Sequence, residues 1–227
     1  MTTRMASQPS ATVAALENMP HHRAEFGEIW AYLYAGLEHI MTSEERLSHR
    51  AYTAIHGTVY AYCTSPRKQS TARSLGTHPN TGADLVGEEL YKELSTYLIS
   101  RVERIQRKLA HKDDIELLRD YAYEWDRYMR GAASLRSLFS HLDRHWIKRE
   151  RDEGKKNIYE VHTLALVQWK THLFVPIQES GPRLIIPLLK LIAQERNGEV
   201  VDQNLLRTVT DSFSRLRKLE VMEVTTT

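Results

Sequence analysis

The residues that could do chemistry in this sequence are a lone cysteine and a pair of histidines. Cys63 would need a nearby base to act as a nucleophile, and the preceding histidine, His56, stands seven residues away, outside any Cys–His site motif. His141 and His145 stand four residues apart in HLDRHW, a spacing that puts two imidazoles on one side of a helix. Zinc takes three or four ligands, and no further ligand follows at a recognisable spacing. We therefore expect an inert thiol at Cys63 and no metal site.

The sequence also lacks the short motifs of common enzyme classes. It contains no GxxxxGK[ST] loop for a nucleotide phosphate, no GxGxxG turn for a dinucleotide, no GxSxG nucleophile turn and no HExxH zinc helix. We expect a protein that is not an enzyme and that carries no cofactor. A metal-dependent enzyme built on His141 and His145 is the competing hypothesis, and zinc analysis of the purified chain would test it.

Composition narrows the classes of partner. The 227 residues include 31 basic and 29 acidic side chains, a formal charge of +2 that lacks the strong basic excess of a nucleic-acid binder. A single cysteine permits no internal disulfide, no run of about 18 apolar residues marks a membrane span, and the first residues lack the apolar core of a secretion signal. We therefore expect no nucleic acid, no membrane, and a location in the cytoplasm and nucleus.

Helical spacing of apolar residues dominates the chain, and few glycines and prolines interrupt it. We predict helices at about 26–41, 85–110, 115–129, 134–149, 158–174, 187–196 and 202–219. One further helix, between the first two of these, is predicted to end near residue 63. Gly131 is expected to separate two of them, and the Ser-, Thr-, Pro- and Gly-rich stretch Thr64–Gly82 is expected to be a loop. No segment has a clear strand pattern. The sequence thus predicts an all-α fold of stacked helical units.

The second predicted helix, AYTAIHGTVYAYCTS, has two apolar or aromatic stripes where one would suffice to pack it. At 100° per residue, Ala51, Ile55, Val59 and Tyr62 fall on one side and can face the core. A second stripe lies about 120° away. Its members are His49, Tyr52, His56 and Tyr60, with Thr53 and Cys63 beside them. Exposed tyrosines on a rigid helix are typical of an interface, but neighbouring helices could equally cover this side. The pattern alone leaves both possibilities open.

The predicted helix at 134–149 has a similar division. Opposite its core stripe lie Ser137, His141, Arg144 and Lys148, and the stretch RHWIKRERDEGKK is locally basic with acidic interruptions. A solvated helix end and a basic rim for an acidic partner are both consistent with this pattern.

Four segments carry a resemblance to a known family. They are YTAIHGTVYAYCTS, GADLVGEELYKEL, LDRHWIKRERDEGKKNIYEVHTLALVQWK and LIAQERNGEVV. In this order they resemble the N-terminal region of cullins, and are most similar to the cullins of Skp–cullin–F-box ubiquitin ligases. The resemblance implies an all-α fold of stacked cullin repeats, in which a five-helix bundle precedes an incomplete second repeat. It divides the chain into a flexible arm at 1–24, an adaptor-binding first repeat at 25–157 and a partial second repeat at 158–227.

The resemblance also implies a function as a non-catalytic scaffold of a cullin-RING ubiquitin ligase. In the family, the N-terminal tip binds a Skp-type adaptor with its F-box protein. A RING protein binds only a C-terminal part, for which this sequence has no counterpart. By position in the motifs, the implied adaptor contacts are Tyr52, Thr53, His56 and Tyr60 on one helix and His141 and Arg144 on another.

These residues lie on the faces that periodicity leaves outside the core. Thr53 and His56 stand where the family has bulkier apolar or aromatic side chains, so we expect a less apolar contact at these positions. The alternative is a generic helical-repeat module that binds a different partner on the same face. Failure to bind Skp-type and BTB-type adaptors would favour it.

Overall fold

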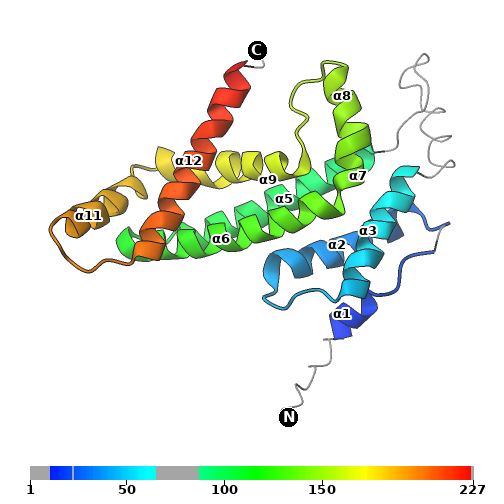
Figure 1. Ribbon diagram of the computed structural model, residues 1–227, viewed down its shortest axis with the longest axis horizontal. Coiled ribbons are helices and arrows are strands. Elements are labelled where there is room, and N and C mark those ends of the chain that lie inside the picture. Colours follow the sequence, from blue (N-terminus) through cyan, green and yellow to red (C-terminus); the bar gives the residue numbers. More distant parts are fainter. Residues whose placement is uncertain (1–10, 22, 65–86, 226–227) are drawn as a thin grey trace, which may run out of the picture. The chain divides into compact units, whose positions relative to one another are not determined.

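The computed structural model describes residues 11–21, 23–64 and 87–225, and within these ranges the regular elements are helices without any strand (Figure 1). The all-α prediction is confirmed. The helices are α1 (Ala11–Ala15), α2 (Phe26–Thr42), α3 (His49–Thr64), α5 (Glu88–Leu109), α6 (Asp114–Leu138), α7 (Ser140–Leu142), α8 (Lys148–Asp152), α9 (Val161–Trp169), α10 (Val175–Glu179), α11 (Ile185–Arg196) and α12 (Gln203–Thr225). Two π-helical turns, η1 (Asp143–Ile147) and η2 (Lys170–Phe174), join α7 to α8 and α9 to α10. The predicted loop after Thr64 lies outside the described residues.

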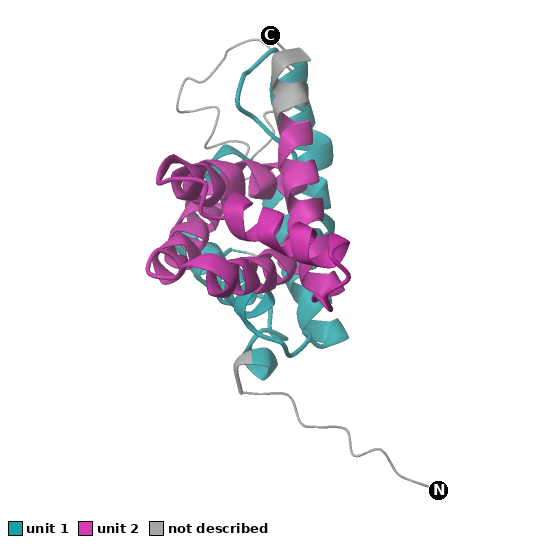
Figure 2. Ribbon diagram, turned by 90° about the vertical axis from the view of Figure 1, so that its left-hand side faces the viewer, with its two compact units in different colours: residues 1–93, 133–160 teal, residues 94–132, 161–227 magenta. Residues whose placement is uncertain are grey.

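The chain forms two compact units, and each draws on separate stretches of sequence (Figure 2). Unit 1 comprises Met1–Glu93 and Ala133–Glu160, and unit 2 comprises Leu94–Ala132 and Val161–Thr227. The repeat boundary expected between residues 157 and 158 stays a prediction, because these units are defined by contacts and not by sequence repeats.

The predicted break at Gly131 is wrong. Helix α6 continues through this glycine from Asp114 to Leu138, and the chain turns only at Phe139. A glycine inside a helix costs only about 1 kcal/mol relative to alanine, and packing readily outweighs that cost. Here Tyr128 before the glycine and Ala132 and Leu135 after it are all buried, so packing holds the helix on both sides of Gly131.

Part of the expected N-terminal arm is folded. From residue 11 the chain forms α1, and the side chains of Val13 and Leu16 are buried against Ala51 of α3. The Tyr32 hydroxyl of α2 donates a hydrogen bond of 2.6 Å to the Leu16 carbonyl. Two well-placed apolar side chains are sufficient for this packing, and they are easily missed in a stretch of small polar residues.

In unit 1, α3 packs against α2 through the stripe that periodicity predicts for the core. Ala51, Ile55 and Val59 are fully buried, and Tyr62 is nearly so. The helix starts after Ser48, whose Oγ accepts a hydrogen bond of 3.1 Å from the Ala51 amide. This arrangement fixes the rotation of α3 and therefore determines which of its residues face outward.

Unit 2 has an aromatic core around Trp169 of α9. The rings of Tyr121, Trp125 and Tyr128, all from α6, lie 5.7, 5.4 and 5.0 Å from the Trp169 ring. The buried Tyr128 hydroxyl donates to the Ala165 carbonyl at 3.0 Å, so the polar end of this side chain is satisfied.

Candidate functional site

The outward side of α3 carries the first part of the candidate site. Tyr52 and His56 are half-buried, Thr53 is exposed, and Tyr60 is the most exposed of the described tyrosines at 51%. The Thr53 hydroxyl donates to the His49 carbonyl at 2.8 Å, so it is satisfied within the helix and leaves its methyl group as the free part of the side chain. Tyr60 is therefore the most exposed ring that this side of α3 offers to a partner.

Segment α7–η1 supplies the second part, and it packs directly against α3. The His141 ring lies edge-on to the Tyr60 ring, with centroids 4.8 Å apart and planes at 68°. The His145 ring also lies close to the His141 ring, with centroids 4.2 Å apart, and both His145 and Arg144 are exposed. The contact between Tyr60 and His141 joins the two predicted halves of the site into one surface of unit 1. We call the predicted residues of this surface, Tyr52, Thr53, His56, Tyr60, His141 and Arg144, the α3–α7 face.

A π-helical turn sets the direction of the basic side chains. The Lys148 amide donates to the Asp143 carbonyl, five residues earlier, where a regular α-helix would use the fourth. The extra residue breaks the regular spacing between Arg144 and Lys148, so the stripe predicted from an ideal helix does not continue unchanged to Lys148. His141 precedes the π turn and keeps its place against Tyr60.

Trp146 anchors η1 in unit 1. Its ring is buried and lies 5.1 Å from the ring of Tyr91 in α5. A Cβ on Gly87, just before α5, would lie 2.5 Å from Trp146 Cγ and 2.9 Å from Leu142 Cδ1. Only a glycine at position 87 lets the Trp146 side chain come this close to the chain before α5. This close packing holds the segment that carries His141. Sequence reasoning missed Gly87 as a supporting residue, because the spacing of GADLVGEELYKEL does not reveal what packs against its second glycine.

The electrostatics of the face favour a neutral aromatic centre with a basic edge. The pKa of His141 lies below its ordinary value, chiefly because the imidazole is partly desolvated, and next because His145, Arg144 and His56 are close. A neutral His141 packs against Tyr60 without an unpaired charge. The exposed guanidinium of Arg144 then supplies positive charge at the edge.

Cys63 has the properties of an inert thiol. The side chain is buried in unit 1, and this burial raises its pKa to about 12. A protonated, buried thiol is a poor nucleophile, in agreement with the sequence-based expectation.

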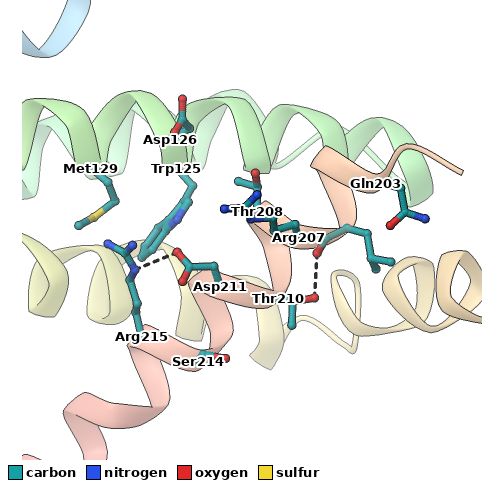
Figure 3. Close-up of a pocket in the computed structure, with 11 residues that line it drawn as sticks. Trp125, Asp126, Met129, Gln203, Arg207, Thr208, Thr210, Asp211, Ser214 and Arg215 are labelled. Carbon is teal, nitrogen blue, oxygen red and sulfur yellow. Dashed lines mark hydrogen bonds and ion pairs between the residues drawn. The ribbon is translucent and has the colours of Figure 1, made fainter.

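Within residues 11–21, 23–64 and 87–225, no three His, Cys, Asp or Glu side chains are grouped as metal ligands, and no helix is both long and apolar enough to span a membrane. A shallow hollow of ≈ 540 Å³ lies between α6 and α12 in unit 2. Figure 3 shows Asp211 and Arg215 of α12 turned toward each other there, at 2.8 Å, so their charges neutralise one another.

Comparison with known proteins identifies relatives over most of the chain. Residues 30–223 match a family described as "Cullin alpha solenoid domain". The chain is 34% identical over 191 residues to Cullin-1 of Dictyostelium discoideum and 33% identical over 196 residues to Cullin-1 of Caenorhabditis elegans. It is 26% identical over 198 residues to Cell division control protein 53 of Saccharomyces cerevisiae. These alignments cover 83%, 83% and 82% of this chain but 24%, 25% and 23% of the relatives. The chain thus spans about a quarter of the length of the curated relatives it matches.

Proposed function

The chain belongs to the cullin family, and from this premise we propose that it is a non-catalytic scaffold segment of a cullin-RING ubiquitin ligase. In this proposal the α3–α7 face binds a Skp-type adaptor that carries an F-box substrate receptor. A RING protein would be bound by the later parts of the family's architecture, and the site of action would be the cytoplasm and nucleus.

The contact between Tyr60 and His141 is the observation that carries the proposal. Periodicity leaves the outer side of α3 undecided, and the family resemblance points to two separate stretches of sequence. The ring contact at 4.8 Å brings these stretches together, on a side of α3 where Tyr60 remains exposed. A large exposed ring held by a neighbouring ring is a pre-ordered contact, so little side-chain entropy is lost when a partner covers it.

The residues of the α3–α7 face fall into two groups: aromatic residues that would anchor a partner, and a charged residue at the edge of the face. Tyr52 and Tyr60 offer the apolar area that interface hot spots use, and truncation of such a residue costs about 2 kcal/mol or more. Thr53 and His56 between them are smaller or more polar. Arg144 lies exposed at the edge, where a charge acts mainly on the rate of association.

A titration of the chain with a purified Skp-type adaptor bound to an F-box protein tests the proposal. We expect binding by the wild-type chain, and a loss of at least about thirtyfold in affinity for each of Tyr52→Ala and Tyr60→Ala, equivalent to about 2 kcal/mol. Tyr123→Ala is the matched control, because Tyr123 is similarly exposed, at 47%, but lies in unit 2. Unchanged affinity in the double tyrosine variant would contradict the assigned face. Absence of binding to Skp-type and BTB-type adaptors would instead favour a helical module with a different partner.

A further inference from the structure

The N-terminal segment crosses α3 beside the α3–α7 face. The Cε and Sδ atoms of Met19 lie 3.3 and 3.4 Å from the position that a Cβ on Gly57 would occupy. Gly57 is four residues after Thr53 and three before Tyr60, so all three lie on neighbouring positions of one side of the helix. The thioether of Met19 therefore covers α3 directly next to two of the predicted contact residues.

Contacts on both sides of Met19 hold this segment in place. Before it, Leu16 is buried and its carbonyl accepts the Tyr32 hydroxyl, and the Glu17 carboxylate accepts the Ser48 hydroxyl at 2.7 Å. After it, the Ala24 side chain is buried, and the Ala24 amide donates to the His21 carbonyl at 2.8 Å. The backbone is thus held in place around Met19, a residue that is still 48% exposed.

Met19 supplies the apolar area that the centre of the face lacks. Thr53 and His56 are small or polar where the cullin resemblance leads to an expectation of larger apolar side chains. A methionine is enriched at interfaces, and its flexible, polarisable side chain adapts to the shape of a partner. Because Gly57 has no side chain, the Met19 side chain can approach the backbone of α3 closely.

The charges around this surface indicate the chemistry of the partner. Arg50 follows the start of α3 with 83% of its side chain exposed, and Arg144 and His145 are exposed at the other border. Glu17 pairs with Arg50 at 3.8 Å and accepts from Ser48, so the charges of Arg50 and Glu17 partly offset each other and the positive charge offered to a partner comes from Arg144. A partner complementary to this border carries acidic groups around an apolar pocket.

We propose that Met19 is a third contact element of the adaptor-binding surface, buried together with Tyr60 in an apolar pocket of an acidic adaptor surface. This inference rests on the proposed function, and it adds the N-terminal segment to the two helical segments that the family resemblance indicates. Met19 thereby compensates in this chain for the smaller contact at Thr53.

The test is the same adaptor titration with the full chain and changes at Met19. Met19→Glu places an acidic group against an acidic partner, and we expect about tenfold weaker binding, equivalent to about 1.4 kcal/mol. Met19→Leu keeps the apolar volume and should bind like the wild type. Val200→Glu is the matched control for added charge, because Val200 is fully exposed in unit 2. Urea unfolding of each variant verifies that the fold is intact.

The possible outcomes separate this inference from the proposed function. If the wild-type chain binds and Tyr60→Ala weakens it, but Met19→Glu binds like the wild type, the role of Met19 is refuted and the adaptor function stands. If Val200→Glu weakens binding as much as Met19→Glu does, a general charge effect explains the result and the inference fails. If the wild-type chain does not bind the adaptor, the proposed function and the role of Met19 fall together.

Discussion

Replacing Gly87 with alanine tests whether the close approach of Trp146 to the start of α5 holds the histidine side of the α3–α7 face. The new Cβ would lie 2.5 Å from Trp146 Cγ and 2.6 Å from Trp146 Cβ. The shorter distance falls 0.9 Å below the 3.4 Å at which ordinary contact begins. Both atoms of Trp146 are close to its backbone, so rotation of a flexible side-chain end cannot relieve the overlap. The backbone of η1 or of Gly87 itself must move instead.

The expected cost follows from the surroundings of this contact. Inserting a methyl group into a packed core costs about 1–3 kcal/mol. Leu142 Cδ1, at 2.9 Å from the new Cβ, and the Tyr91 ring, at 5.1 Å from Trp146, close the other routes of relaxation. We therefore expect a loss of about 2 kcal/mol, which lowers the melting temperature of a chain of this length by about 4–8 °C.

Thermal unfolding followed by circular dichroism measures this effect, and the adaptor titration of the folded variant measures the displacement of His141. Gly27→Ala is the matched control, because it lies in α2 with no atom within 4 Å of the new Cβ. Higher helix propensity should raise its stability by up to about 1 kcal/mol. If Gly87→Ala has the same melting temperature as the wild type and binds the adaptor with the same affinity, the packing argument for Gly87 is wrong.

Three further predictions concern Cys63, Trp169 and His141. Burial raises the pKa of Cys63 to about 12, so iodoacetamide at pH 8 should leave the native thiol unmodified and alkylate it in urea; rapid modification of the native chain would contradict its burial. Trp169→Ala removes the ring shared by three aromatic neighbours and should lower the free energy of unfolding by about 3–5 kcal/mol in urea titrations; a loss below about 1 kcal/mol would show that the core refills the site. The folded-state pKa of His141 is lowered by partial desolvation and by His145, Arg144 and His56, so the unfolded chain binds more protons and stability falls as the pH drops below about 6.5. His141→Gln should weaken this dependence relative to a His111→Gln control at an exposed position, and equal slopes would refute the assignment.

Periodicity predicts the helices of this chain well wherever one apolar stripe determines the packing. The core stripe of α3 is confirmed, because Ile55, Val59 and Tyr62 recur at helical steps and are all buried. It fails at Gly131, where the local preference of glycine indicates a break and the burial of the surrounding residues keeps α6 continuous. The turn at Phe139 and the π turn after it depend on tertiary contacts, which a spacing rule does not include.

For the candidate site, too, the sequence predicts some residues and misses others. Helical geometry identifies the outward residues of α3, and the cullin resemblance links them to His141 and Arg144. Neither source indicates Met19 or Gly87. The role of Met19 rests on its contact with Gly57, and the role of Gly87 rests on its contact with Trp146, and both partners are distant in sequence. Met19 in particular lies in a stretch whose composition is typical of an arm, and only its place above Gly57 reveals a contact with α3.

The interleaved course of α5 and α6 has a consequence for synthesis of the protein. Both helices pass from one unit to the other, and the aromatic residues of α6 find their common partner, Trp169, only in α9. While the ribosome has released no more than α6, Tyr121 and Tyr128 lack the Trp169 ring that they contact in the folded chain. The nascent chain thus presents an unfinished aromatic surface until α9 emerges. A chain that pauses before residue 169 would be the form most in need of a chaperone.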